Sequence, residues 1–192
     1  MWDFLFKPIR LPRRLHAACG LFALLAMLGL SLSAATAAQT GEAELKVAFL
    51  FNFLKLTEWP DIGSSETVDL CLARIDPFDS ALDIFQGQQI QGKPVKTRIL
   101  ESAKNLPGCR LLFIPDSDKV GAIPAWLEAA ASLAVLTVSD RTGFIDHGGM
   151  IGLIILDNKL RFEVNLEPVQ HSGLKLRAQL LQLALRVEGI RP

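Results

Sequence analysis

Hydrophobic positions early in the chain recur at helical spacing. Glu44 to Leu56 contains no Gly or Pro, so the segment predicts a helix. One stripe of this helix consists of Leu45, Ala48, Phe49, Asn52, Phe53 and Leu56. Further apolar residues, Val47, Phe51 and Leu54, lie off that stripe. We therefore expect the helix to be covered on more than one side and to end at Trp59-Pro60, because proline cannot continue it.

After this helix, short apolar runs of strand length alternate with helical or turn segments. The strand candidates are Val68 to Ala73, Lys96 to Leu100, Arg110 to Pro115, Leu133 to Ser139, Met150 to Leu156 and Leu160 to Leu166. Helices are predicted for Pro77 to Phe85, with Asp76 as its cap, and for Pro124 to Ala131. A closing helical region is predicted to begin at Glu167-Pro168, with its apolar positions between Leu174 and Val187.

This alternation favours a layered α/β sandwich with a mixed, mostly parallel sheet of about six strands. Continuous apolar runs such as Leu111 to Ile114 are typical of strands buried on both faces. The last two strands are separated only by Asp157-Asn158-Lys159, which is too short for a crossover helix. The sheet is therefore expected to end in an antiparallel hairpin.

The first residues have the order of a secretory signal peptide. Lys7, Arg10, Arg13 and Arg14 precede an apolar run over Leu21 to Leu32, and small residues follow. The run is shorter than the ~20 residues that a membrane-spanning helix needs. We expect cleavage between Ala37 and Ala38, with an uncleaved anchor as the alternative.

Cleavage would leave residues 38–192 as one domain of 155 residues. The leader carries four basic residues and one acidic residue, so the remaining domain has a net charge of −3. A mildly acidic domain without a basic cluster is a poor candidate for nucleic-acid binding.

Two cysteines, Cys71 and Cys109, remain in the mature chain. In an oxidising compartment an isolated pair most simply forms one disulfide. The alternative is two buried thiols at strand ends that never meet. Zinc is not expected here, because a structural zinc site needs four closely grouped ligands.

Few residues in this chain are suited to catalysis. His147 and His171 are the only histidines of the mature chain, tyrosine is absent, and no common nucleophile, zinc or nucleotide-binding motif occurs. Asp116 with Asp118, or Asp140 with Asp146, would be placed at strand ends and would support a hydrolase only if they converged. We therefore expect no catalytic residues and no cofactor.

Apolar residues are more numerous than one small core needs, and such an excess commonly marks protein association. They include Phe49, Phe51, Phe53, Leu54, Trp59, Phe144, Ile145 and Ile151. We expect the exposed side of the terminal hairpin, with Ile151, Glu163 and Asn165, to bind a partner.

Several segments, taken in order, resemble the periplasmic YfiR-like proteins. They are Val47 to Phe53 with Glu58-Trp59-Pro60, Leu70-Cys71, Asp76-Pro77-Phe78, Gly108 to Ile114, Leu136 to Asp140, Gly148 to Gly152 and Arg161 to Leu166. The resemblance covers nearly all of the mature chain. It also implies the Cys71–Cys109 disulfide, whereas a second cysteine pair found in some members, around the Gly-Gly-Met segment, is absent here.

The resemblance implies a non-enzymatic periplasmic regulator that binds and represses an inner-membrane diguanylate cyclase, and so affects cyclic di-GMP and biofilm behaviour. It further implies that an outer-membrane-associated lipoprotein can sequester the regulator, and that the protein forms a homodimer. Another membrane sensor, such as a sensor kinase, is an alternative partner. A different hypothesis is a periplasmic small-molecule-binding sensor that passes its signal to a membrane receptor.

Overall fold

The structure is a computed structural model that describes residues 41–60 and 65–189. The predicted leader and its cleavage position at Ala37 and Ala38 lie outside the described residues. No helix within the described ranges is long and apolar enough to cross a bilayer.

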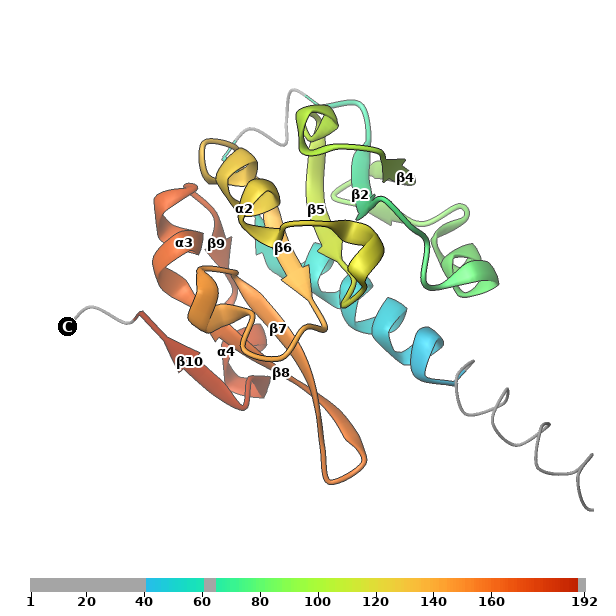
Figure 1. The fold of residues 1–192 in the computed structure, drawn as a ribbon. Helices are drawn as coiled ribbons and strands as arrows, with labels where there is room; N and C mark the ends of the chain where they lie inside the picture. Colours follow the sequence, from blue (N-terminus) through green and yellow to red (C-terminus); the bar gives the residue numbers. More distant parts are fainter. Residues whose placement is uncertain (1–40, 61–64, 190–192) are drawn as a thin grey trace, which may run out of the picture. The chain divides into compact units, whose positions relative to one another are not determined.

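The main element is an eight-stranded mixed sheet with the order β10-β8-β7-β6-β5-β2-β4-β3 (Figure 1). Its strands are β2 (Val68–Ala73), β3 (Gln89–Ile90), β4 (Lys93–Leu100), β5 (Cys109–Ile114), β6 (Leu136–Ser139), β7 (Ile151–Leu156), β8 (Lys159–Asn165) and β10 (Arg186–Glu188). Strands β4, β2, β5, β6 and β7 are parallel, and β8 returns antiparallel to β7. The predicted mostly parallel sheet with a terminal hairpin is confirmed, with two short strands added at its edges.

Helical segments cover both faces of this sheet (Figure 1). They are an N-terminal helix described over residues 41–56, α2 (Ile123–Ala131), α3 (Leu166–His171) and α4 (Ala178–Leu183), with 3-10 turns η2 (Asp79–Phe85), η3 (Ala103–Asn105), η4 (Asp118–Val120) and η5 (Ile145–His147). The helix predicted from Pro77 is the shorter η2, and the carboxylate of Asp76 accepts a hydrogen bond from the N–H of Phe78 just before it.

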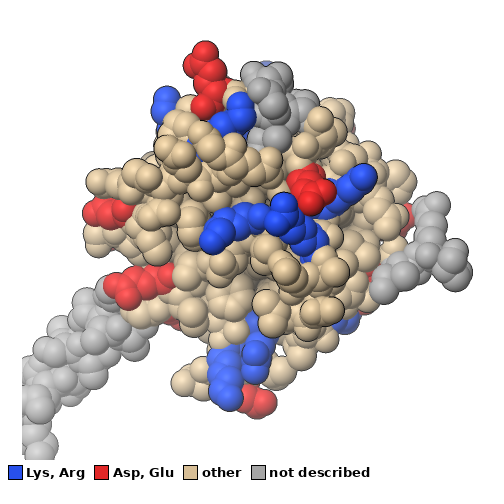
Figure 2. Space-filling view, turned by 180° about the vertical axis from the view of Figure 1, so that it is seen from behind, with Lys and Arg blue, Asp and Glu red and all other residues tan. Residues whose placement is uncertain are grey.

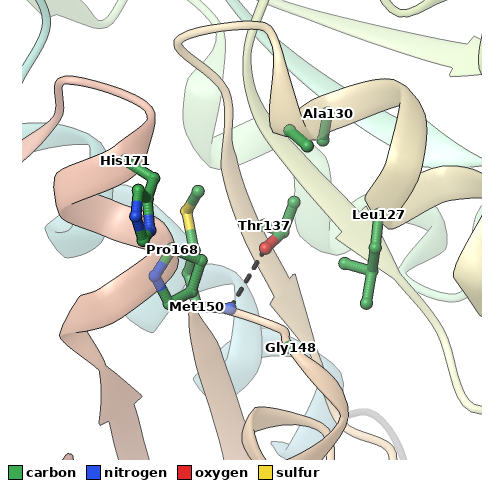
Figure 3. A pocket seen from close by; sticks show the side chains of 8 residues that line it. Leu127, Ala130, Thr137, Gly148, Met150, Pro168 and His171 are labelled. Atoms are coloured by element: carbon green, nitrogen blue, oxygen red, sulfur yellow. Dashed lines mark hydrogen bonds between the residues drawn. The ribbon is translucent and has the colours of Figure 1, made fainter. Parts of the chain in front are cut away.

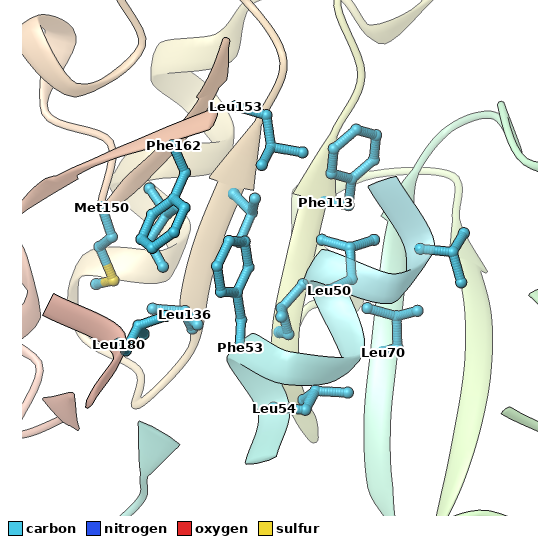
Figure 4. Close-up of a cluster of buried hydrophobic side chains, with 14 of the residues drawn as sticks. Leu50, Phe53, Leu54, Leu70, Phe113, Leu136, Met150, Leu153, Phe162 and Leu180 are labelled. Atoms are coloured by element: carbon cyan, nitrogen blue, oxygen red, sulfur yellow. The ribbon is translucent and has the colours of Figure 1, made fainter. Parts of the chain in front are cut away.

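Alternate residues of the central strands enter two separate hydrophobic cores. In β2, Val68, Leu70 and Leu72 join the larger core, whereas Cys71 and Ala73 join the smaller one. The N-terminal helix packs in the larger core (Figure 4), and α2 packs in the smaller one. Strands buried on both faces explain why their sequences are continuous apolar runs.

The buried stripe of the N-terminal helix differs from the predicted one. Val47, Leu50 and Leu54 are fully buried, whereas Leu45 is 45% exposed and Asn52 lies in solvent. Both stripes have helical spacing, and only Phe53 belongs to the buried side in either case. The helix is covered on more than one side, as expected, since the ring of Phe49 contacts Phe162 and the ring of Phe51 contacts Phe85.

The predicted closing helical region is confirmed in part, as the two short helices α3 and α4. The strand β9 (Lys175–Leu176) lies between these helices and β10 follows them, where the prediction had helix. Strand β9 pairs with β1 (Thr57–Glu58) directly after the N-terminal helix, and β10 pairs with the edge of β8. Strand pairing with distant segments therefore overrides the local helical spacing.

The predicted disulfide between Cys71 and Cys109 is confirmed. It joins the neighbouring strands β2 and β5 across 38 positions of sequence, with the two Cα atoms 5.9 Å apart. Both cysteines are buried in the smaller core. The bridge therefore fastens two central strands of the sheet from within.

Candidate functional site

The three residues predicted to bind a partner lie at different depths. Ile151 is fully buried, so the expectation that it lies on an exposed face is wrong. Its register partner is Val164, which points into the larger core like its neighbour Phe162. Glu163 and Asn165 are half-buried and have partners within the chain. A role of these residues in partner binding stays a prediction.

Glu163 belongs to an ion-pair cluster centred on Arg186 of β10. The Nε and second terminal nitrogen of Arg186 donate to the two carboxylate oxygens of Glu163, at 3.0 and 3.1 Å. Arg186 also donates to Glu188 at 2.7 Å and to Asp146 at 3.1 Å. These bonds, with that to Glu163 first, raise the pKa of Arg186. The cluster fixes edge strand β10 to β8 and to η5.

Asn165 caps helix α3. Its side-chain oxygen accepts a hydrogen bond from the N–H of Glu167 at 3.0 Å, as expected of an N-cap residue. Its side-chain amide donates to the carbonyl of Ile145 at 3.1 Å. Asn165 therefore holds the end of β8, the start of α3 and η5 together.

The strand-end carboxylates do not converge as a catalytic pair would. Asp140, which follows β6, accepts hydrogen bonds from the N–H of Asp116 at 2.8 Å and from the Lys46 ammonium at 2.6 Å. Asp146 does not come together with Asp140, because it forms an ion pair with Arg186. Across the described residues, no group of three or more His, Cys, Asp or Glu side chains is placed to hold a metal ion.

Lys46 is a site residue that the sequence reading missed. Its ammonium bonds Glu42 at 2.7 Å, one helical turn earlier, as well as Asp140. Burial alone would lower the pKa of Lys46, but the hydrogen bonds to Asp140 and Glu42 outweigh burial and raise the pKa. The available signal was a lysine flanked by Leu45 and Val47, because a charge beside apolar positions needs a partner when it is half-buried.

A small apolar pocket of about 240 Å³ lies between α2 and α3 (Figure 3). Leu127 and Ala130 of α2 face Pro168 and His171 of α3 across it. At its base, the Thr137 hydroxyl accepts a hydrogen bond from the N–H of Met150 at 3.1 Å. His171 supplies the one ionisable side chain of this lining. The pocket is therefore mostly apolar, with Thr137 and His171 as the polar side chains of its lining.

A second cavity, of about 360 Å³, lies beside the outer half of β7, and we call it the β7 slot. Its polar side is formed by Glu42, Lys46, Asp140 and Thr142. Its apolar side is formed by Leu153, Ile154, Ile155 and Leu160. The slot therefore lies between the N-terminal helix, the end of β6 and the terminal hairpin.

The fold and the site together define an α/β domain in which the polar side chains described above form ion pairs and a helix cap. Residues 43–185 match the YfiR/HmsC-like family, and the chain belongs to that family. The family is periplasmic, is known for regulatory rather than catalytic proteins, and is associated with diguanylate cyclase signalling. The predicted family is thereby confirmed.

No curated protein matches the chain. Among solved structures, the ABC domain from Streptococcus pneumoniae, determined in complex with L-Trp, is similar with a TM-score of 0.50 and 11% sequence identity. The match covers 76% of this chain and 60% of that chain. At this identity the likeness extends to the fold alone.

Proposed function

We propose that this protein is a periplasmic, non-enzymatic regulator that binds a membrane-bound signalling protein and represses it. The partner proposed first is an inner-membrane diguanylate cyclase, so that the output is cyclic di-GMP and biofilm formation. The observation that carries the proposal is membership of the YfiR/HmsC-like family over residues 43–185. The leader sequence up to Ala37 supports export.

The contacts of the strand-end carboxylates agree with a binding role. Asp140 and Asp146 each have a cationic partner within the domain, Lys46 and Arg186, and they do not form a catalytic pair with each other. The Nδ1 of His147 lies 2.8 Å from the carbonyl of Gly143, within its own turn. We further propose that the protein forms a homodimer and that an outer-membrane-associated lipoprotein competes for it.

Deletion of the gene tests this proposal. Cyclic di-GMP and surface attachment are expected to rise in the deletion strain and to return when the full-length gene is restored. A copy without residues 1–37 is the matched control, because it makes the same domain without export and should not complement. Unchanged cyclic di-GMP in the deletion strain would contradict the cyclase proposal.

The pocket between α2 and α3 supports a second candidate function, that of a small-molecule sensor. In this case ligand binding would alter the fit of α3, and the membrane partner would read that change. Native mass spectrometry of protein purified from periplasmic extract tests the idea. A retained mass that disappears in an Ala130→Phe variant would support it, whereas protein of the bare chain mass would count against it.

A further inference from the structure

The terminal hairpin extends beyond the rest of the sheet (Figure 1). Strand β6 pairs with β7 only through Val138 with Ile151 and Ser139 with Gly152. Strand β7 continues to Leu156, and over these last four residues its ladder partner is β8. The other edge of β7 thus runs without a neighbouring strand for about 13 Å.

Backbone groups on this edge point away from β8. In an antiparallel pair, successive residues direct their N–H and C=O groups to opposite sides. The carbonyl of Met150 accepts from the N–H of Asn165 at 2.8 Å, so every second residue after Met150 also faces β8. Leu153 and Ile155 therefore face the opposite edge. The β6 register ends at Gly152, so both backbone groups of Ile155 are open to a partner.

The composition of this edge favours pairing rather than preventing it. Proteins usually protect an open strand edge with charged residues or proline. The outermost strand β10 carries Arg186 and Glu188, and the outer part of β8 carries Lys159 and Arg161. Basic side chains are visible at the hairpin tip in Figure 2. In contrast, β7 reads Ile-Gly-Leu-Ile-Ile-Leu without a charge, and Ile155 is 59% exposed.

The β7 slot lies along this open edge and limits what can occupy it. Leu153, Ile155 and Leu160 form its apolar side. Glu42 and Asp140 outnumber Lys46 on its polar side, so the slot has a net charge of −1. The side chain of Glu42 is 45% exposed even with its bond to Lys46. An apolar side chain beside a basic one would complement this lining.

We infer that the β7 slot binds an extended segment of the membrane partner as an added strand beside Leu153–Leu156. The segment bonds the open backbone groups of Ile155, places an apolar side chain against Leu153 and Leu160, and places a basic side chain near Glu42. This is β-augmentation, in which backbone bonds supply affinity and alternate side chains supply specificity. The inference rests on the proposed function, because it names the surface through which the regulator docks.

A synthetic peptide tests the backbone requirement directly. The probe is a fluorescent peptide of about seven alternating valine and lysine residues, titrated with full-length exported protein by fluorescence anisotropy. The matched control peptide has the same side chains but carries N-methyl groups on alternate backbone nitrogens. We expect the control to bind roughly tenfold more weakly or worse. No binding of the first peptide, or equal binding of both, would overturn the inference.

Two substitutions locate the binding edge. Ile155→Pro removes the open N–H, at an edge position where proline is compatible with a strand, and should weaken peptide binding roughly tenfold. If the proline variant misfolds, Ile155→Lys replaces it in this test, because the lysine charge protects the same strand edge from pairing. The control is Leu156→Lys, whose backbone faces β8 and whose side chain is also exposed, so binding should change less than about twofold.

Two further results show whether the occupant, the slot or the proposed function is wrong. If Ile155→Pro abolishes concentration-dependent self-association but leaves peptide binding unchanged, the occupant is a second copy of this chain and the inference is overturned. In cells, deletion of the gene tests the proposed function, whereas the Ile155→Pro allele tests the slot. Full complementation by that allele in a strain where deletion does raise cyclic di-GMP would reject the slot and leave the proposed function standing.

Discussion

Removal of the Cys71–Cys109 disulfide should strongly reduce the stability of the domain. The bridge closes a loop of 38 positions, and the chain-entropy relation gives about 4 kcal/mol of lost stability for a loop of this length. For a domain of this size, that change lowers Tm by roughly 8–16 °C. The double variant Cys71→Ala with Cys109→Ala measures this effect, because it removes the covalent link without leaving a thiol.

Thermal unfolding followed by circular dichroism, with and without reductant, is the assay for this prediction. The oxidised wild type should unfold at the highest temperature, and the double variant should not respond to reductant. Because both sulfurs are buried in the smaller core, wild-type protein should be reduced slowly in the native state and quickly after unfolding. A double variant within about 3 °C of the oxidised wild type would refute the reasoning.

Three further predictions concern packing and charge. Gly149→Ala should lower the free energy of unfolding in urea by about 1–3 kcal/mol, because the added Cβ would lie 2.2 Å from the Phe144 ring. Gly152→Ala is the control and should be close to neutral, because its added Cβ would make only ordinary contacts. Glu163→Lys should lower Tm by placing a cation against Arg186, and the further change Arg186→Met, which removes that repulsion, should recover part of the loss; no recovery would argue against the ion pair. Because the folded pKa of Lys46 is raised above 10.5, its stabilisation is present below that pH and is lost as pH rises through the folded pKa. As pH rises above 10.5, unfolding free energies should therefore fall more for wild type than for Lys46→Met, and parallel curves would contradict this.

Local sequence spacing was sufficient for the central part of the fold. Val68 to Ala73 was predicted with its observed bounds, because a continuous apolar run between turn residues is typical of a strand buried on both faces. The hairpin was predicted from Asp157-Asn158-Lys159. Asp157 and Asn158 both have positive φ, at 50° and 57°, as a two-residue hairpin turn requires.

Features that depend on distant contacts could not be predicted in the same way. Ile151 was assigned to the wrong side of the hairpin, since that choice needs the pairing of Ile151 with Val164. The β9 and β10 strands depend on partners more than 20 residues away, and the ion pair of Lys46 with Asp140 spans 94 positions. The β7 slot exists only because β6 ends before β7 does.

The pairing of β1 with β9 also governs the order in which the domain can mature. Thr57 meets Leu176, so the end of the first helix is secured by a segment near the opposite end of the chain. A polypeptide emerges N-terminus first, whether from the ribosome or from a translocation pore. The end of this helix therefore lacks its strand partner until nearly the whole chain has emerged, and Phe53 also gains its contact with Phe162 late. Nascent or partly translocated protein is expected to need a chaperone that holds this helix during that interval.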